Sequence, residues 1–141
     1  MTSQHSYLIA TLFGIGLLNT LQAADFKVIT SDAVTVSEIS ASEIKEIFLE
    51  TKTSLAGAGR VEPVLAKGGP AHEAFLKQLV GKTDAALVAY YRGLIFTGKG
   101  SMPKVFASDA EVAAYIAKSK GAIGYVSADA ELPGVKTLEV K

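Results

Sequence analysis

The sequence contains no cysteine, and its formal net charge is zero. Without cysteine there is no disulfide framework, no thiol nucleophile and no thiolate metal site. The neutral balance of charges argues against a nucleic-acid-binding protein, because such proteins need a basic face that displaces counterions from phosphates. We therefore expect no nucleic-acid partner. The length of 141 residues fits one domain with its own hydrophobic core.

Motifs for catalysis and for metal binding are also missing. The sequence has no P-loop, no Gly-x-Ser-x-Gly motif and no cluster of residues at metal-ligand spacing. After the N-terminal region histidine occurs once, as His72 beside Glu73, and no serine and aspartate accompany it in a triad order. We therefore predict that the protein is not an enzyme, and we expect no catalytic residue, metal ion or cofactor.

One long apolar run is present, and it lies near the N-terminus. Leu8 to Leu18 is uncharged, and a small residue, Ala23, follows shortly after it. This pattern is typical of a signal peptide, and the run is shorter than the roughly 20 residues of a transmembrane helix. The segment before it has no lysine or arginine, so that an uncleaved anchor or a buried helix remains an alternative. We expect a signal peptide over residues 1–23 and an exported, soluble periplasmic domain over residues 24–141.

Beyond this region, β-rich and amphipathic segments alternate. Expected strands cover residues 26–30, 61–66, 105–106, 122–126 and 135–140. Expected helices begin at the capping boxes Ser40–Glu43 and Ser108–Glu111, at Pro70, and at a cap formed by Thr83 or Asp84. Residues 51–60 are expected to form a loop, and Pro63 places its strand near an edge or a bend. Such alternation is typical of an α/β domain in which helices cover a central sheet.

The stretch Gly121 to Val126 reads Gly-Ala-Ile-Gly-Tyr-Val. We expect Gly121 to cap the preceding helix in the left-handed conformation, and the residues after it to form a strand buried on both faces. Gly124 has no side chain, so that a helix or another backbone segment can approach it closely. Tyr125 alternates with buried neighbours and is expected to lie in the core.

The order of these pieces resembles the phosphate-binding-protein-like group, the relatives of the substrate-binding component of phosphate ABC transporters. The resemblance rests on EIKEIFLETKT (43–53), on VEPVLAKGGPAHEAFLKQLVGKT (61–83) and on the segment from AYYRGLIFTGKG to GAIGYV (89–126). It implies the type II periplasmic-binding-protein architecture, an α/β lobe with a mixed central sheet and helices packed on it. Full-length members clamp an oxyanion between two lobes, whereas this length fits about one.

An oxyanion is bound well by backbone N–H groups at a helix N-terminus, and glycines let the backbone approach the anion closely. The turn from Lys67 to His72 offers both features, and its lysine and histidine add donors. The carboxyl end of the first strand is a second candidate, because ligands prefer the carboxyl ends of strands in open α/β sheets. The candidate ligand-binding residues are Thr30, Ser31, Arg60, Lys67, Gly68, Gly69, Ala71 and His72.

Arginine is the side chain that binds oxyanions in a bidentate manner, and the chain has two. We favour Arg60 as a helper of the Lys67–His72 turn, because Arg92 stands beside two tyrosines at the polar edge of a helix. Lys99 and Ser101, in a loop flanked by glycines, are weaker candidates.

The expected function is therefore that of an exported, non-enzymatic solute-binding protein for phosphate or a related small oxyanion, working with a membrane transport or sensing system. The alternative is a lobe without ligand that serves as an interaction module of an envelope complex. The turn of the full-length phosphate binders carries an arginine and a Ser-Gly-Thr-type loop, and those hydroxyls are missing here. A homodimer that rebuilds a two-lobed cleft is a third alternative. A ligand binder should have a concave positive pocket at Gly68–Gly69, and an interaction module an exposed apolar patch.

Overall fold

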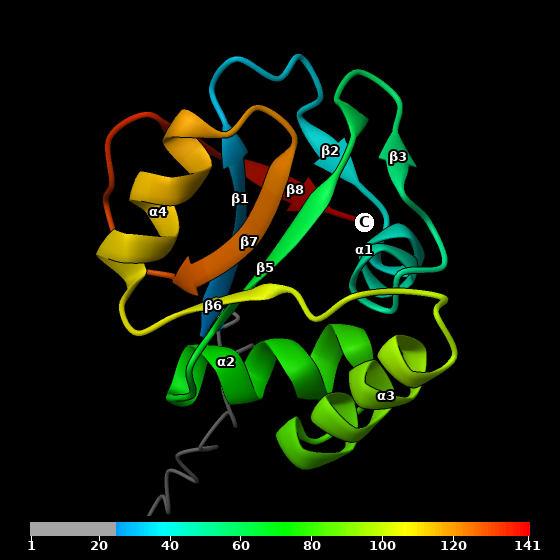
Figure 1. Ribbon diagram of the computed structural model, residues 1–141. Helices are drawn as coiled ribbons and strands as arrows, with labels where there is room; N and C mark the ends of the chain where they lie inside the picture. Colours follow the sequence, from blue (N-terminus) through cyan, green and yellow to red (C-terminus); the bar gives the residue numbers. More distant parts are fainter. Residues whose placement is uncertain (1–24) are drawn as a thin grey trace, which may run out of the picture.

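The computed structural model describes residues 25–141, and the predicted signal peptide at residues 1–23 lies outside them. The described chain folds around a six-stranded sheet with helices on both faces (Figure 1). This confirms the α/β fold with a mixed central sheet. Within residues 25–141, none of the helices combines the length and the apolar character that a membrane span requires.

The large sheet contains β1 (Phe26–Ser31), β2 (Glu38–Ile39), β5 (Glu62–Ala66), β6 (Lys104–Phe106), β7 (Ala122–Ser127) and β8 (Val135–Val140). A small hairpin, β3 (Ser54–Leu55) and β4 (Gly59–Arg60), occupies part of the segment expected to be a loop. The helices are α1 (Ala41–Phe48), α2 (Pro70–Phe75), α3 (Asp84–Phe96) and α4 (Asp109–Lys118), and α2 continues into the π-helical turn η1 (Leu76–Val80).

The strand order is β2-β8-β1-β7-β5-β6, and β1 runs antiparallel to both of its neighbours while the other pairs are parallel. The carboxyl ends of β5, β6 and β7 therefore meet at one edge of the sheet, and β1 ends at the opposite edge. Pro63 does not mark an edge strand, because β5 lies between β7 and β6. It stands before the paired stretch of β5 and β6, which begins at Val64, so that its missing N–H costs no bond there.

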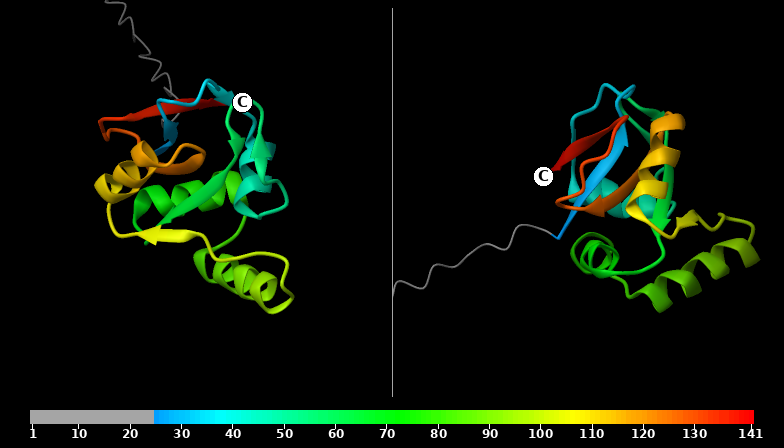
Figure 2. Two further views of the ribbon diagram at one scale, coloured as in Figure 1. Left: turned by 45° about the horizontal axis from the view of Figure 1, so that its top comes forward. Right: turned by 90° about the vertical axis from the view of Figure 1, so that its left-hand side faces the viewer.

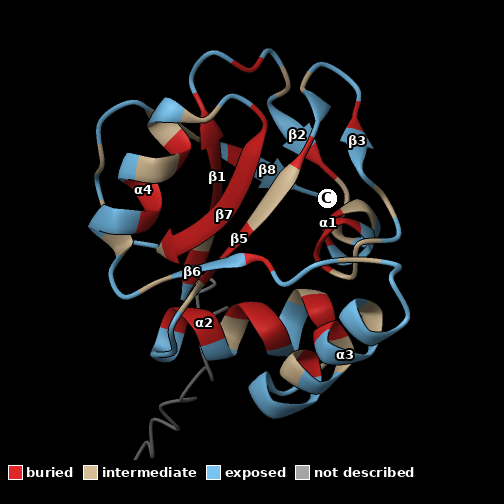
Figure 3. Ribbon diagram, in the orientation of Figure 1, coloured by how far each residue is buried: buried red, intermediate tan, exposed pale blue. Residues whose placement is uncertain are grey.

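The two faces of the sheet are covered by different helices. On β7, Ile123 and Tyr125 belong to the core cluster shared with α1, α2 and η1, whereas Ala122 and Val126 belong to the cluster shared with α4. Figure 3 shows that β1 and β7 are the most completely buried strands. The expectation that residues 122–126 form a strand buried on both faces is confirmed. Gly124 faces α4 and lies against its apolar side chains, as the missing side chain predicts.

The helix starts follow the capping pattern of the sequence with one difference. At α1 the Ser40 hydroxyl accepts a hydrogen bond from the Glu43 N–H, and the Glu43 carboxylate accepts one from the Ser40 N–H. At α4 the Ser108 hydroxyl accepts a bond from the Glu111 N–H. The Glu111 carboxylate, however, accepts from the Ala107 N–H at 2.9 Å. The prediction of a second capping box is therefore wrong for one of its two bonds. The Glu111 carboxylate binds the N–H of Ala107 and not that of Ser108.

Gly121 does not cap α4. The helix ends at Lys118 with Ser119 as its C-cap, and Gly121 follows with a φ of +98°. A Cβ at this position would collide with the backbone carbonyl oxygen of Arg60. Glycine is therefore required here by the left-handed backbone and by the close approach of β4.

Helix α3 lies outside the layer formed by α2 and η1 (Figure 2). Only Leu87 and Tyr91 of its 13 residues are buried. Its contact with the rest of the fold includes two tyrosine hydroxyls, since Tyr91 donates to the Phe48 carbonyl and Tyr90 to the Leu49 carbonyl. Most of the helix surface is therefore exposed, and these two bonds attach it to the end of α1.

Candidate functional site

The Lys67–His72 turn joins β5 to α2 at the edge where the parallel strands end. The Lys67 N–H donates to the Phe106 carbonyl at 2.9 Å, which fixes the turn against β6. Gly68 and Gly69 have φ values of +121° and +93°, and a Cβ on either would meet nothing within 4 Å. The backbone on this side is therefore open, and only glycine adopts both angles without strain.

No side chain caps the first turn of α2. Gly69 is its N-cap and Pro70, which has no N–H, occupies the first helical position. The next N–H groups, those of Ala71 and His72, belong to the first turn, where the helix itself offers no acceptor. Because η1 continues α2, the helical backbone extends from Pro70 to Val80. The turn can therefore present backbone donors to an anion at the positive end of a helix dipole.

The His72 side chain points into the protein rather than toward the turn. It is 2% exposed, and its Nε2 lies 2.7 Å from Asp84 Oδ1. Its Nδ1 contacts the Tyr125 hydroxyl, which accepts a hydrogen bond from the Ala66 N–H at 3.1 Å. Burial raises the pKa of the Tyr125 hydroxyl above its ordinary value, so that it stays protonated and can donate to Nδ1. Nε2–H then donates to Asp84, and both ring nitrogens are satisfied.

This arrangement corrects the expectation that the His72 side chain donates to a ligand. Its ring is buried and both nitrogens are engaged inside the protein, so that only its backbone N–H remains for the turn. The His72 side chain instead supports the turn from inside. It binds the Tyr125 hydroxyl, and this hydroxyl binds the N–H of Ala66, the residue that directly precedes Lys67.

Replacing Tyr125 with phenylalanine should lower the free energy of unfolding by about 1–3 kcal/mol, because the buried His72 Nδ1 and the partly buried Ala66 N–H both lose their partner. Urea denaturation measures the change. Tyr115→Phe is the matched control, since its half-buried hydroxyl bonds the partly exposed Glu62 carboxylate and should cost less than about 1 kcal/mol. Equal losses in the two variants would contradict this supporting role.

Thr30 and Ser31 lie far from the turn. Thr30 pairs with Ile123 near the start of β7, and Pro63 pairs with the same residue near the start of β5. Lys67 follows Pro63 by four strand steps, which is roughly 13 Å. The expectation that the end of the first strand helps the turn is thus corrected, because β1 is antiparallel to β7 and ends at the other edge.

The two hydroxyls are also engaged locally. The Thr30 hydroxyl donates to the Ala122 carbonyl at 3.2 Å, and the Ser31 Oγ accepts from the Ala33 N–H at 3.2 Å. Both residues are less than 5% exposed. They act as structural groups of the sheet in this structure.

Arg60 lies on β4, at the same far edge of the sheet, and cannot help the turn either. It lines a separate groove together with Lys99 and Ser101, the two weaker candidates of the sequence, and with Lys120. Arg92 is exposed on α3 and does not line this groove. The structure therefore divides the candidate residues into two sets, the turn at residues 67–72 and the groove around Arg60.

Three residues of these surroundings were not found from the sequence. Tyr125 was expected in the core without a partner for its hydroxyl, and Asp84 was considered only as a helix cap. Lys120 precedes a glycine at the end of a charged helix, which is common on protein surfaces and carries no signal of its own. Tyr125 and Asp84 act through His72, from which they are 53 and 12 positions away in the sequence.

Comparison with solved structures gives the same fold. A phosphate ABC transporter substrate-binding protein from Clostridium perfringens, solved with bound phosphate, matches 82% of this chain with a TM-score of 0.63 at 20% identity. An ABC-type phosphate transport receptor from Vibrio cholerae matches 82% with a TM-score of 0.60 at 14% identity. PstS from Borrelia burgdorferi matches 83% with a TM-score of 0.60 at 13% identity. No protein-family model matches the sequence, and no curated protein matches it significantly.

The resemblance seen in the sequence is therefore confirmed for the fold. The matched region spans 44%, 46% and 47% of these three solved chains, respectively, which is about half of their length. These comparisons give no support to the homodimer alternative.

Proposed function

We propose that the protein is an exported, non-enzymatic solute-binding protein that binds phosphate or a related small oxyanion for a membrane transport or sensing system. The observation that carries the proposal is the open, uncapped turn at Lys67–His72, at the carboxyl ends of three parallel strands. Ligands of α/β sheets prefer this edge. The fold, which is also that of proteins named for phosphate transport, supports the same ligand class.

The proposed contacts are few and mostly from the backbone. The N–H groups of Gly69, Ala71 and His72 are the donors that can converge on one oxyanion, and the exposed Lys67 supplies a positive charge. No serine or threonine hydroxyl stands in this turn. We therefore expect a modest affinity, and one that falls as the salt concentration rises, since an exposed lysine is readily screened.

The first experiment is calorimetric titration of the purified protein at low salt with phosphate, sulfate and a small carboxylate. Saturable micromolar binding of one oxyanion is the expected result. Circular dichroism of the same sample establishes that it is folded. A folded sample that gives no heat with any of these anions would exclude the proposed function.

Gly69→Val should weaken oxyanion binding at least tenfold, because the side chain enters the open space and the φ of +93° becomes strained. Titration of the variant with the same anion measures the loss. Gly98→Val is the matched control, since Gly98 also has a positive φ of +69° and open space around it, but lies in the loop after α3. Unchanged affinity in a folded Gly69→Val protein would remove the turn as the site.

The interaction module remains a second candidate, and one observation favours it. Apolar side chains on and after α3 are exposed, with fractions of 51% for Ile95, 92% for Phe96, 41% for Met102 and 44% for Val105. A partner protein with an apolar contact surface would cover such side chains, and a carboxylate on it would pair with the exposed Arg92 of α3. Absence of anion binding, together with a protein partner lost on Phe96→Ser, would favour this function.

A further inference from the structure

A basic groove lies at the edge of the sheet opposite to the Lys67–His72 turn. Its volume is about 540 Å³, and its walls come from the end of α1, the β4–β5 segment, the loop after α3 and the segment between α4 and β7. This volume falls within the range of roughly 300–1,000 Å³ that small-molecule sites occupy. Four cations line it, Lys52, Arg60, Lys99 and Lys120.

The charges of the groove are not balanced. Lys52 is paired with Glu43 at 2.7 Å. The Glu62 carboxylate accepts from the Tyr115 hydroxyl at 2.7 Å and lies 3.5 Å from Lys104 Nζ. Among residues 25–141, no ion pair is formed by the three other cations of the groove, which are Arg60, Lys99 and Lys120.

Glu50 is the remaining carboxylate of the groove, and its contacts hold the loop after α3 in place. It accepts hydrogen bonds from the Ser101 N–H at 2.9 Å and from the Ser101 hydroxyl at 3.5 Å. These partners are uncharged and do not neutralise Glu50. The groove is still positive, because its walls carry four cations and only two carboxylates, Glu50 and Glu62. A Cβ on Gly100 would collide with the Glu50 carboxylate, which means that glycine is needed for this contact.

The opposite wall is fixed in a similar way. Gly121 lies so close to the Arg60 carbonyl that no side chain fits between them, which holds the segment carrying Lys120 against β4. Glu50, at the end of α1, has a φ of +58°, a conformation that residues other than glycine seldom adopt. The segments that carry the cations of the groove are therefore held in place by tertiary contacts of their backbones.

We infer that this groove binds a small-molecule polyanion, a compound with two or more separated phosphate or carboxylate groups. A single phosphate is much smaller than the groove, and one arginine can satisfy two of its oxygens. Three cations on three different segments fit a ligand that spreads its charge over a longer distance. The half-buried Pro63 adds apolar surface to the same walls, which suits the carbon skeleton of an organic polyanion. This site is distinct from the turn of the proposed function.

The test uses inorganic diphosphate and triphosphate as probes, titrated into the purified protein at low salt. Saturable binding of either probe is expected, with an affinity at least tenfold above that for phosphate. Arg60→Gln and Lys120→Gln should each weaken it about tenfold, since each removes a charge-assisted hydrogen bond. Lys118→Gln is the matched control, because it is exposed on the same helix end and does not line the groove.

Gly69→Val separates this inference from the proposed function. The inference is supported if Gly69→Val and the control Lys118→Gln leave diphosphate binding unchanged. Arg60→Gln and Lys120→Gln must then weaken it. The inference is overturned by a folded protein that binds neither probe, by affinity that Arg60→Gln and Lys120→Gln leave unchanged, or by loss of diphosphate binding in Gly69→Val. Tighter binding of a glutamate-rich peptide than of triphosphate would also overturn it, in favour of a protein ligand.

Discussion

Replacing Gly124 with leucine is expected to lower the free energy of unfolding by about 3 kcal/mol, close to the upper end of typical overpacking costs. A Cβ at this position would lie 2.7 Å from Val64 Cγ2, 3.0 Å from Ile116 Cδ1 and 3.3 Å from Val112 Cγ1. All three neighbours are completely buried, so that they cannot move into solvent. The leucine side chain must instead separate α4 from the sheet. Urea denaturation of the variant measures the loss.

Gly93→Leu is the matched control for this prediction. Gly93 lies on the exposed side of α3, and a Cβ there would meet nothing within 4 Å. The same substitution should therefore be neutral or stabilise the protein by up to about 1 kcal/mol, since leucine is the better helix former. A Gly124→Leu protein as stable as the parent would show that the contact between β7 and α4 is not close-packed.

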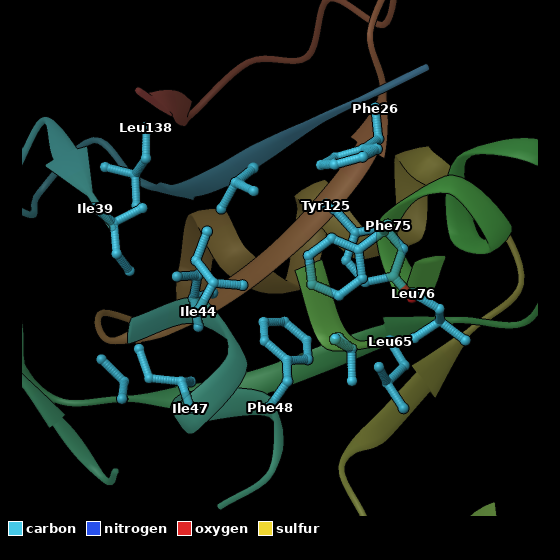
Figure 4. Close-up of a cluster of buried hydrophobic side chains, with 14 of the residues drawn as sticks. Phe26, Ile39, Ile44, Ile47, Phe48, Leu65, Phe75, Leu76, Tyr125 and Leu138 are labelled. Carbon is cyan, nitrogen blue, oxygen red and sulfur yellow. The ribbon is translucent and has the colours of Figure 1, made fainter. Parts of the chain in front are cut away.

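Replacing Phe75 with alanine is expected to cost about 3–5 kcal/mol, the usual range for a fully buried aromatic ring. Phe75 is 0% exposed and stacks on Tyr125 with ring centroids 3.8 Å apart. Its ring also meets the rings of Phe48 at 4.7 Å and Phe26 at 5.5 Å in edge-on geometry. Figure 4 shows these rings between α1, α2 and the sheet. Removal of the Phe75 ring leaves a cavity, and α1, α2 and the sheet would all have to move to close it.

The loss should be visible as a lower midpoint in urea and a lower melting temperature. Phe96→Ala serves as the control, because Phe96 is 92% exposed and its removal should change stability by less than about 0.5 kcal/mol. A Phe75→Ala cost as small as that of Phe96→Ala would contradict the central place of this ring in the core. Because Phe75 also stacks on Tyr125, which bonds the end of β5, its loss should loosen the Lys67–His72 turn as well.

Much of the fold follows from local patterns in the sequence. The strand at residues 122–126 was predicted from an uninterrupted run without charge, and Ser40–Glu43 correctly predicted the start of α1. Both depend on neighbours within a few residues, where side-chain periodicity and capping chemistry act directly. The order of the pieces, through their resemblance to a known family, predicted the layered α/β fold.

The features that could not be predicted depend on distant parts of the chain. The direction of β1 is set by its pairing with β7 and β8, and no local pattern distinguishes a parallel from an antiparallel strand of this kind. The side chain of His72 was interpreted as a ligand donor because its partners, Asp84 and Tyr125, are not adjacent in sequence. The groove combines cations at positions 60, 99 and 120, which only the folded chain brings together.

The place of β1 in the sheet also sets the order in which the protein can fold. Phe26 pairs with Ser127 and Ser31 with Val135, so that the first strand of the described chain needs the last two strands as partners. Since a ribosome adds roughly 5–20 residues per second, β1 remains without them for on the order of 5–20 s of synthesis. During that interval the unpaired segment Phe26 to Ser31, with its apolar Phe26, Val28 and Ile29, is available to any chaperone or export factor that meets the growing chain.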